Sequence, residues 1–209
     1  MSSISIIGLG NMAGALAERA IAGGNAVEII GRDPAKAKEL AASLGGATVG
    51  TAGTAPAGDI VILAVPYGSA AAVVSEYGDA LIGKIVIDIT NPVAPDLTGF
   101  VTPDGSSGAQ EIAKAAPAGA HVVKAFNTLF ANVLAAGSAE GRPLDVFIAG
   151  DDAQAKAHVS VFIESLGLRP FDAGQLPMAR SLENAGLLEM GLTHSLKHTN
   201  FALGVNLVS

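Results

Sequence analysis

A glycine-rich turn near the start of the chain constrains the fold most. The β-branched run at residues 4–7 is typical of a buried strand. Gly8, Gly10 and Ala13 follow it at the spacing G-x-G-x-x-A, and an alanine-rich helix is expected to continue to about residue 23. The first amides of such a helix favour anions. Strand, turn and helix together predict a site for the pyrophosphate of a dinucleotide, with a purely structural turn as the alternative.

Strand and helix patterns alternate along the chain, which predicts a Rossmann-type, doubly wound and mostly parallel sheet with helices on both faces. About eight strands are expected, at residues 3–8, 26–31, 47–49, 59–65, 84–89, 121–126, 144–150 and 168–171. Helices are expected over residues 11–23, 34–43, 69–77, 109–116, 153–166 and 176–199. We expect residues 1–174 to form the nucleotide-binding domain. Residues 175–209 should add a short C-terminal helix and tail to the same unit.

Composition argues against several classes of protein. Twelve Lys and Arg against nineteen Asp and Glu give a formal net charge of −7, whereas a general nucleic-acid binder is normally basic. The absence of cysteine excludes a disulfide framework and a thiolate nucleophile. No apolar run approaches the length of a membrane span, and the chain enters a strand directly rather than through a secretory signal. We therefore expect a cytoplasmic protein that acts on a small molecule.

The end of the second expected strand selects between the two nicotinamide dinucleotides. NAD sites usually place Asp or Glu there, but this chain has Gly31 followed by Arg32. A small residue and a guanidinium suit the 2′-phosphate of NADP, and Lys36 adds positive charge one helical turn further on. Asp33 leaves an alternative open, because its carboxylate can bind a ribose hydroxyl or cap the next helix. The pattern favours NADP(H).

Three turns at expected strand ends predict where the nicotinamide lies. In open α/β sheets the ligand lies over the carboxyl ends of the strands, where the strand order reverses. The turns after residues 59–65, 84–89 and 121–126 bring small residues, proline and two asparagine amides to that edge. Ordinary turn chemistry is the alternative reading of these segments. The expected cofactor contacts there are Ala64, Val65, Pro66, Tyr67, Asn91, Pro92, Ala125 and Asn127.

Residues suited to acid–base chemistry are few. Lys124 and Glu183 are the conceivable proton carriers. His194 and His198 have the i, i+4 spacing of a metal-binding pair, but no third ligand is evident and a lysine adjoins them, so no metal is expected. Hydride transfer to a flavin-like ring needs positioning more than a general acid, because the cofactor carries the chemistry. No residue is therefore assigned as catalytic.

Several runs of residues resemble one family of reductases. The runs are 8–12, 31–32, 63–66, 123–128, 149–152 and 167–174. They resemble the short NADPH-dependent coenzyme F420 reductases, and they are similar to the cytosolic NADPH-oxidising domain of the six-transmembrane ferric reductases. The resemblance implies a homodimer formed through the final helix and the apolar tail at residues 201–208. It also implies phosphate-binding roles for Gly8, Leu9, Gly10, Asn11, Met12, Arg32 and Lys36.

The function implied by this resemblance is hydride exchange between NADPH and a deazaflavin (F420) or flavin-like ring. Archaeal-type members carry Thr, Ser and Arg where this chain carries Leu9, Gly31 and Asp33, and the turn at residues 127–130 is closer to the ferric-reductase branch. Two alternatives remain open. One is an NADPH-dependent reductase of another small acceptor, such as a ferric chelate, an imine or a carbonyl. The other is a non-catalytic NADP(H)-binding redox sensor.

Overall fold

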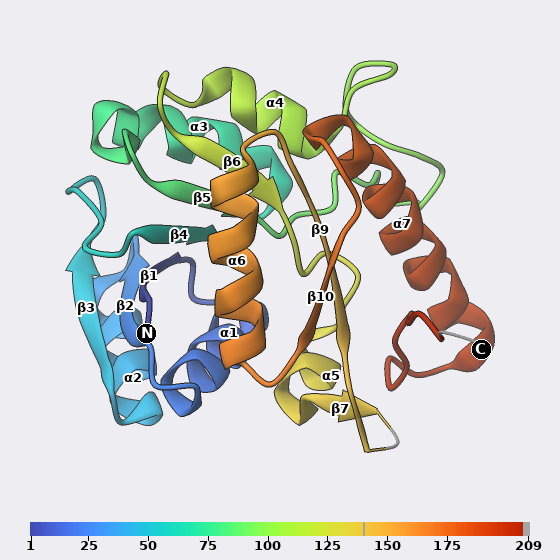
Figure 1. Cartoon of the computed structure of the whole chain (residues 1–209), viewed down its shortest axis with the longest axis horizontal. Coiled ribbons are helices and arrows are strands. Elements are labelled where there is room, and N and C mark those ends of the chain that lie inside the picture. The colour runs from blue at the N-terminus through green and yellow to red at the C-terminus, as the bar shows by residue number, and fades with distance from the viewer. Residues whose placement is uncertain (140, 207–209) are drawn as a thin grey trace.

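The computed structural model describes residues 1–139 and 141–206, and its centre is an eight-stranded sheet with helices on both faces (Figure 1). The predicted strands are confirmed in number and place. They are β1 (Ser3–Ile7), β2 (Ala26–Gly31), β3 (Ala47–Thr51), β4 (Ile60–Leu63), β5 (Ile85–Asp88), β6 (His121–Lys124), β9 (Asp145–Gly150) and β10 (Arg169–Asp172).

The strand order of the sheet is β10-β9-β6-β5-β4-β1-β2-β3. All neighbours are parallel except β6 and β9, which run antiparallel. The connections wind outward in opposite directions from β1 and β4, so the strand order reverses between these two strands. Parallel sheets of this kind bind ligands at the carboxyl edge beside that reversal.

The helices also follow the prediction, with one addition. They are α1 (Asn11–Ala22), α2 (Pro34–Leu44), α3 (Tyr67–Tyr77), α4 (Gly108–Ala115), α5 (Ala131–Ala136), α6 (Ala153–Ser165) and α7 (Ala179–Leu196), with 3-10 turns at Gly78–Leu81 and Leu176–Met178. The sequence patterns did not predict α5 or the small hairpin of β7 (Ser138–Ala139) and β8 (Arg142–Pro143). Both elements are too short to show a clear periodicity.

Two apolar cores lie on opposite faces of the sheet. One joins the sheet to α1, α2, α5 and α6, and the other joins it to α3, α4 and the start of α7. In β1, Ile6 faces the first core and Ile7 the second, as the alternation of a strand requires. Ser5 is also buried, where its hydroxyl donates to Glu28 and accepts from the Gly58 amide. Burial on both faces explains why the central strands are nearly all apolar.

Side-chain caps fix the starts of three of the predicted helices. The Asp33 carboxylate accepts from the amides of Ala35 and Lys36 at the start of α2. Ser107 and Gln110 form a capping box at the start of α4. Asp152 accepts from the Ala155 amide at the start of α6. These caps hold the loops at the strand ends in fixed positions.

The last helix ends earlier than predicted. We expected it to run to residue 199, but Lys197 adopts a left-handed conformation (φ 62°) and its amide donates to the Thr193 carbonyl, which ends α7 at Leu196. His198 therefore lies beyond the helix, and the i, i+4 pairing with His194 is lost. Within residues 1–139 and 141–206, no three acidic or histidine side chains come together as a metal site.

Residues 201–206 turn back and pack beside α5 and β9. Residues 207 and 208, which belong to the predicted apolar tail, lie outside the described residues. Phe201 packs edge-on against Phe130, with ring centroids 5.4 Å apart. The Asp145 carboxylate accepts from the Val205 amide and also binds the Arg169 guanidinium at 2.7 and 3.0 Å. The folded tail thus reaches the edge of the sheet.

That edge is β10, a four-residue strand with a proline inside it. Arg169 and Ala173 donate their amides inward to the carbonyls of Leu144 and Ile148 on the β9 side. Pro170 lies between these inward donors, so its nitrogen faces outward, where it carries no hydrogen. The row of backbone amides that faces outward from the edge of the sheet therefore lacks a donor at Pro170.

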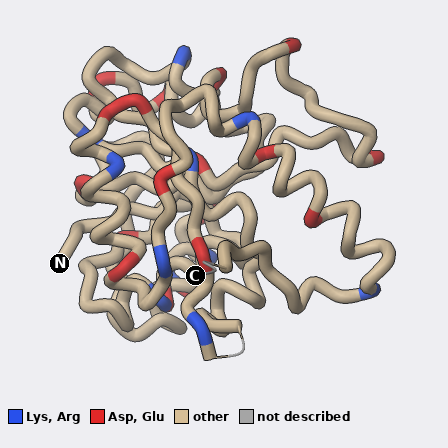
Figure 2. The backbone as a smooth tube through the Cα atoms, turned by 45° about the vertical axis from the view of Figure 1, so that its right-hand side comes forward, with Lys and Arg blue, Asp and Glu red and all other residues tan. Residues whose placement is uncertain are grey.

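None of the helices in the described part of the chain combines the length and apolarity needed to span a membrane. Lys and Arg positions are scattered among Asp and Glu positions along the tube in Figure 2.

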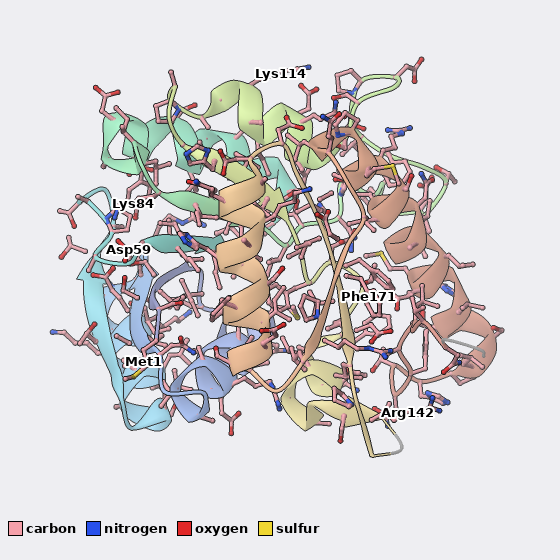
Figure 3. All side chains as sticks on the ribbon, in the orientation of Figure 1. Met1, Asp59, Lys84, Lys114, Arg142 and Phe171 are labelled. Carbon is pink, nitrogen blue, oxygen red and sulfur yellow. The ribbon has the colours of Figure 1, made fainter. Side chains whose placement is uncertain are left out.

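The amino ends of β4 and β5, marked by Asp59 and Lys84, lie on the opposite side of the view from α7 (Figure 3). The carboxyl edge of these strands therefore faces α7.

Candidate active site

A cavity of about 690 Å³ lies at the carboxyl ends of β1, β2 and β4. We call it the dinucleotide cavity. It brings together nine of the predicted contact residues, which come from three separate turns. They are Gly8, Leu9, Gly10, Gly31, Arg32, Lys36, Ala64, Val65 and Pro66. The turns after β5 and β6, which were predicted to share a crevice with residues 64–67, do not line this cavity.

Positions 8 and 10 of the first turn are glycine for different structural reasons. Gly8 has a φ of 136°, and a Cβ there would lie 2.0 Å from the Ala64 carbonyl oxygen, so only glycine fits between β1 and β4. Gly10 has no such constraint, because a Cβ there would have no described atom within 4 Å. Its missing side chain instead leaves open space above the start of α1. This open space is where a pyrophosphate can approach the backbone.

The start of α1 offers unpaired hydrogen-bond donors to that space. Gly10 precedes the helix without a side-chain cap, and the first turn holds no acidic residue. The first described amide of the helix with a backbone partner is that of Gly14, which donates to the Gly10 carbonyl. The amides before it point out of the helix, as they do in phosphate-binding helices. The residues present therefore fit a dinucleotide.

Leu9 and Gly31 fit together across the mouth of the cavity. A Cβ at Gly31 would lie 2.5–2.8 Å from three carbons of the Leu9 side chain. Leu9 thus fills the space that an acidic side chain would need at the end of β2. An acidic side chain at position 31 would require the Leu9 side chain to move.

Arg32 and Lys36 provide positive charge at the far end of the dinucleotide cavity. Neither side chain forms an ion pair or hydrogen bond with another part of the described chain. Asp33 and Glu76 also line the cavity. The Asp33 carboxylate already accepts two amide hydrogens as the cap of α2. Its role as a cap, left open by the sequence, is therefore observed.

A smaller cavity of about 200 Å³ lies at the carboxyl ends of β5 and β6, against α7. We call it the α7 cavity. It brings together three of the predicted residues, namely Met12, Asn91 and Asn127. Its other lining residues are Ile89, Phe126, Leu129, Phe130, Ala131, Gly186, Glu189 and Met190. Met12 belongs to the first turn of α1, so the two cavities lie on either side of that turn.

Asn91 and Asn127 form a paired amide network at the α7 cavity. The Asn91 side chain donates to the Asn127 carbonyl at 2.8 Å, and the Asn127 side chain donates to Asn91 Oδ1 at 2.9 Å and to the Leu182 carbonyl at 2.8 Å. The buried Asn127 Oδ1 has no hydrogen-bond partner among the described residues. Such an acceptor is costly unless a ligand or water donates to it.

Backbone geometry supports this network from two sides. Phe126 is fully buried with a left-handed φ of 61°, a conformation that costs about 1–3 kcal/mol in a non-glycine residue. That backbone turn directs Asn127 across to Asn91. On the other side, a Cβ at Gly186 would lie 2.6 Å from Asn91 Oδ1, so α7 approaches this closely only because residue 186 is glycine.

Lys124 and Glu183 form part of a buried ionic cluster beneath the network, rather than free proton carriers. The fully buried Lys124 ammonium lies 2.8 Å from Asp88 Oδ2 and 2.9 Å from Glu183 Oε1, and it also donates to the Thr90 carbonyl. Glu183 further accepts from the amide of Gly108 at the start of α4. This cluster ties β5, β6, α4 and α7 together at the carboxyl edge.

Four predicted contacts line neither cavity. Ala125 and Pro92 are buried, and Asn11 is exposed at the start of α1. Tyr67 turns its ring toward α4, where a Cβ at Gly108 would lie 3.0 Å from it. Partial burial raises the pKa of the Tyr67 hydroxyl, and the carboxylates of Glu111, Glu183 and Asp88 add to this effect.

Glu189 is the residue that sequence reasoning missed. It is 2% exposed and lines the α7 cavity, and burial raises the pKa of its carboxyl to about 7, partly offset by a hydrogen bond from the Leu203 amide. The sequence held one signal, because Glu189 is the lone charge within the apolar run at residues 186–192. A glutamate flanked by leucines and methionine is more easily buried than one in a charged run.

Comparisons with known proteins agree with this geometry. Residues 3–92 match the family described as NADP oxidoreductase coenzyme F420-dependent. The F420-dependent NADP reductase of Methanocaldococcus jannaschii is 29% identical over 160 residues, which cover 73% of this chain and 69% of that protein. A solved structure of a putative F420-dependent NADP-reductase from Arthrobacter sp. FB24 is 26% identical with a TM-score of 0.87. That match covers 99% of this chain and 100% of the other.

A second relative is a larger protein. Metalloreductase STEAP3 of Rattus norvegicus is 33% identical over 180 residues, which cover 86% of this chain. The chain spans only about a third of that protein's length, since the match covers 35% of it. The similarity is therefore to one part of the larger reductase.

Proposed function

Because residues 3–92 match the family of coenzyme F420-dependent NADP oxidoreductases, we propose that this chain belongs to that family and transfers hydride between NADPH and a deazaflavin or flavin-like ring. The observation that carries the proposal is the pair of cavities on either side of the first turn of α1, since Gly10 lines one and Met12 the other. A dinucleotide laid across that turn reaches both cavities, with its pyrophosphate over the open space at Gly10.

Three parts of NADPH have a matching group in the chain. The backbone at residues 8–12 would hold the pyrophosphate, and Arg32 and Lys36 would hold the 2′-phosphate, because their cations are free of other partners in the described chain. The unpaired Asn127 Oδ1 would accept from the nicotinamide carboxamide. Bound NADPH supplies the hydride.

The protein's contribution to the reaction is position and exclusion of water. Asn91, held by Asn127 and by the close approach of Gly186, would fix the plane of the ring. The apolar walls of the α7 cavity, including Met12 and Phe130, would keep water from the transferred hydride. Holding two rings in contact is itself a large catalytic effect.

Arg32→Ala is expected to weaken NADPH binding about 10- to 100-fold while leaving NADH binding nearly unchanged, since a hydrogen bond to a charged group contributes roughly 1.5–3 kcal/mol. Fluorescence titration of both cofactors measures this. Lys38→Ala is the matched control, because Lys38 is exposed on α2, the helix that follows Arg32, and lines neither cavity. Equal losses for NADPH and NADH would overturn the assignment of the 2′-phosphate.

The acceptor is tested by following the nicotinamide absorbance with F420, FMN, FAD, a ferric chelate and a cyclic imine in parallel. Oxidation of NADPH by F420 or a flavin supports the proposal. Turnover with only the ferric chelate or the cyclic imine would show that the acceptor belongs to that chemical class instead. Tight NADPH binding with no turnover on any of the five would favour a redox sensor over an enzyme.

We also propose that two copies associate through α7. Its outer face carries Leu188, 56% exposed, and Leu196, 44% exposed, with the half-buried Leu192 between them. An apolar stripe of this kind on a helix is typical of a helix–helix interface. Light scattering should give twice the chain mass of 20.7 kDa, and Leu188→Glu should return the monomer. A monomer in the unaltered protein would contradict the proposal.

A further inference from the structure

Glu189 is an acidic group built into the α7 cavity, and the hydride-transfer reaction proposed above does not yet use it. It stands on α7 one turn after Gly186, the residue that lets the helix approach Asn91. Its side chain is buried with Met12, Asn127 and Phe130 around the same cavity. Its carboxyl group forms one long hydrogen bond within the described chain, in which Oε1 accepts from the Leu203 amide at 3.4 Å.

Apart from Glu189 itself, the residues that line the α7 cavity are uncharged. Met12 on α1, Asn91 after β5, Asn127 after β6 and Ala131 on α5 are neutral, so Glu189 is the one titratable residue among those lining the cavity in the described chain. The nearest charges on the same helix point elsewhere. Glu183 is paired with Lys124 in the cluster beneath, and His194 is exposed to solvent.

From this placement we infer that Glu189 is the proton-transfer group for the second substrate, which is therefore an acceptor that takes a hydride at carbon and a proton at nitrogen or oxygen. The inference rests on the proposed hydride transfer. A carboxyl group that lines the cavity where the nicotinamide and its acceptor are proposed to meet can give a proton at one stage and take it back at another. Because the residues around Glu189 in the cavity are neutral, the incoming substrate is the group in position to form a hydrogen bond with its carboxyl.

The step balances without any further reactant. The acceptor's carbon gains a C–H bond from the hydride of NADPH, while the O–H bond of the Glu189 carboxyl breaks and a new N–H or O–H bond forms on the acceptor. NADPH is oxidised by two electrons and the acceptor is reduced by two. Glu189 is left as a carboxylate and is reprotonated from solvent before the next turnover.

The direction of the reaction sets the protonation state that Glu189 must have. Burial without a positive partner favours the neutral acid and raises its pKa to about 7. Reduction of the acceptor needs the acid, so its rate should fall as pH rises through about 7. The reverse reaction, from the reduced acceptor to NADP⁺, needs the carboxylate and should fall as pH drops through the same value.

The experiment compares the unaltered protein with Glu189→Gln, which keeps the size and removes the proton. With F420 as the acceptor, which takes the hydride at carbon, Glu189→Gln should lower kcat roughly 10²- to 10⁴-fold and flatten the pH dependence in both directions. NADPH affinity should stay within about twofold, because the lost group serves the acceptor. Glu164→Gln, an exposed change on α6, is the matched control and should alter neither profile.

A second readout does not depend on turnover. Carboxyl ¹³C resonances of glutamate-labelled protein without ligands should include one that titrates near pH 7, and Glu189→Gln should remove it. If that resonance titrates with the exposed glutamates, or if Glu189→Gln keeps the wild-type pH profile, the inference fails while the proposed function stands. If the unaltered protein oxidises no NADPH with any acceptor, the proposed function itself fails.

Discussion

Lys124→Met is expected to lower the free energy of unfolding by about 3–5 kcal/mol, because it leaves buried carboxylates without their cation. The Lys124 ammonium lies within 2.9 Å of Asp88 and Glu183, and all three side chains are fully buried. Methionine matches the volume of lysine, so the loss would come from charge rather than from a cavity. Urea unfolding at neutral pH measures it.

The control for this prediction is another lysine that pairs with an acid at the surface. Lys114, 67% exposed, lies 2.7 Å from Glu111, and Lys114→Met should change stability by less than about 1 kcal/mol. A second variant that combines Lys124→Met with Asp88→Asn and Glu183→Gln should recover much of the loss, because it removes the uncompensated charges. A small effect of Lys124→Met alone would show that the cluster is not essential to the fold.

Gly10→Val is expected to weaken NADPH binding more than about 100-fold, or roughly 3 kcal/mol, with little change in stability. No described atom lies within 4 Å of a Cβ at this position, so the fold can accept a side chain there. The same side chain would occupy the space above α1 where the pyrophosphate is proposed to approach. Calorimetric titration with NADPH and thermal unfolding measure the two effects separately.

Gly14→Ala, one turn further along α1, is the matched control. A Cβ there would make an ordinary contact of 3.8 Å with Leu40, so neither binding nor stability should fall. If Gly10→Val unfolds the protein, the space above Gly10 is needed for folding. If Gly10→Val keeps full affinity for NADPH, the pyrophosphate lies elsewhere.

The parts of the fold that could be predicted are those with local signals. Short β-branched runs such as residues 60–63 mark buried strands, and Asp33, Ser107 and Asp152 mark helix starts because each caps with its own side chain. The fingerprint at residues 8–13 fixed the first strand and helix. Nothing local signals the reversal of β9, since its pairing with β6 depends on how the sheet closes.

The candidate site was predicted only where it follows strand ends. Lys124 and Glu183 were selected as separate proton carriers, but their pairing across 59 residues arises from packing that one sequence does not show. Glu189 looks like a surface acid on a helix until the tail folds back and Leu203 covers it. Contacts between residues far apart in the sequence, rather than the residue types themselves, place Lys124 and Glu183 in one ionic cluster and bury Glu189 as a lone acid.

The proline in β10 has a consequence for how copies of the chain can meet. A sheet edge with a complete row of donors can extend by pairing with the same edge of another molecule. In β10, Pro170 removes a donor from the middle of a row only four residues long. This edge therefore lacks one of the donors that strand addition would use, which disfavours growth into a continuous intermolecular sheet from this side.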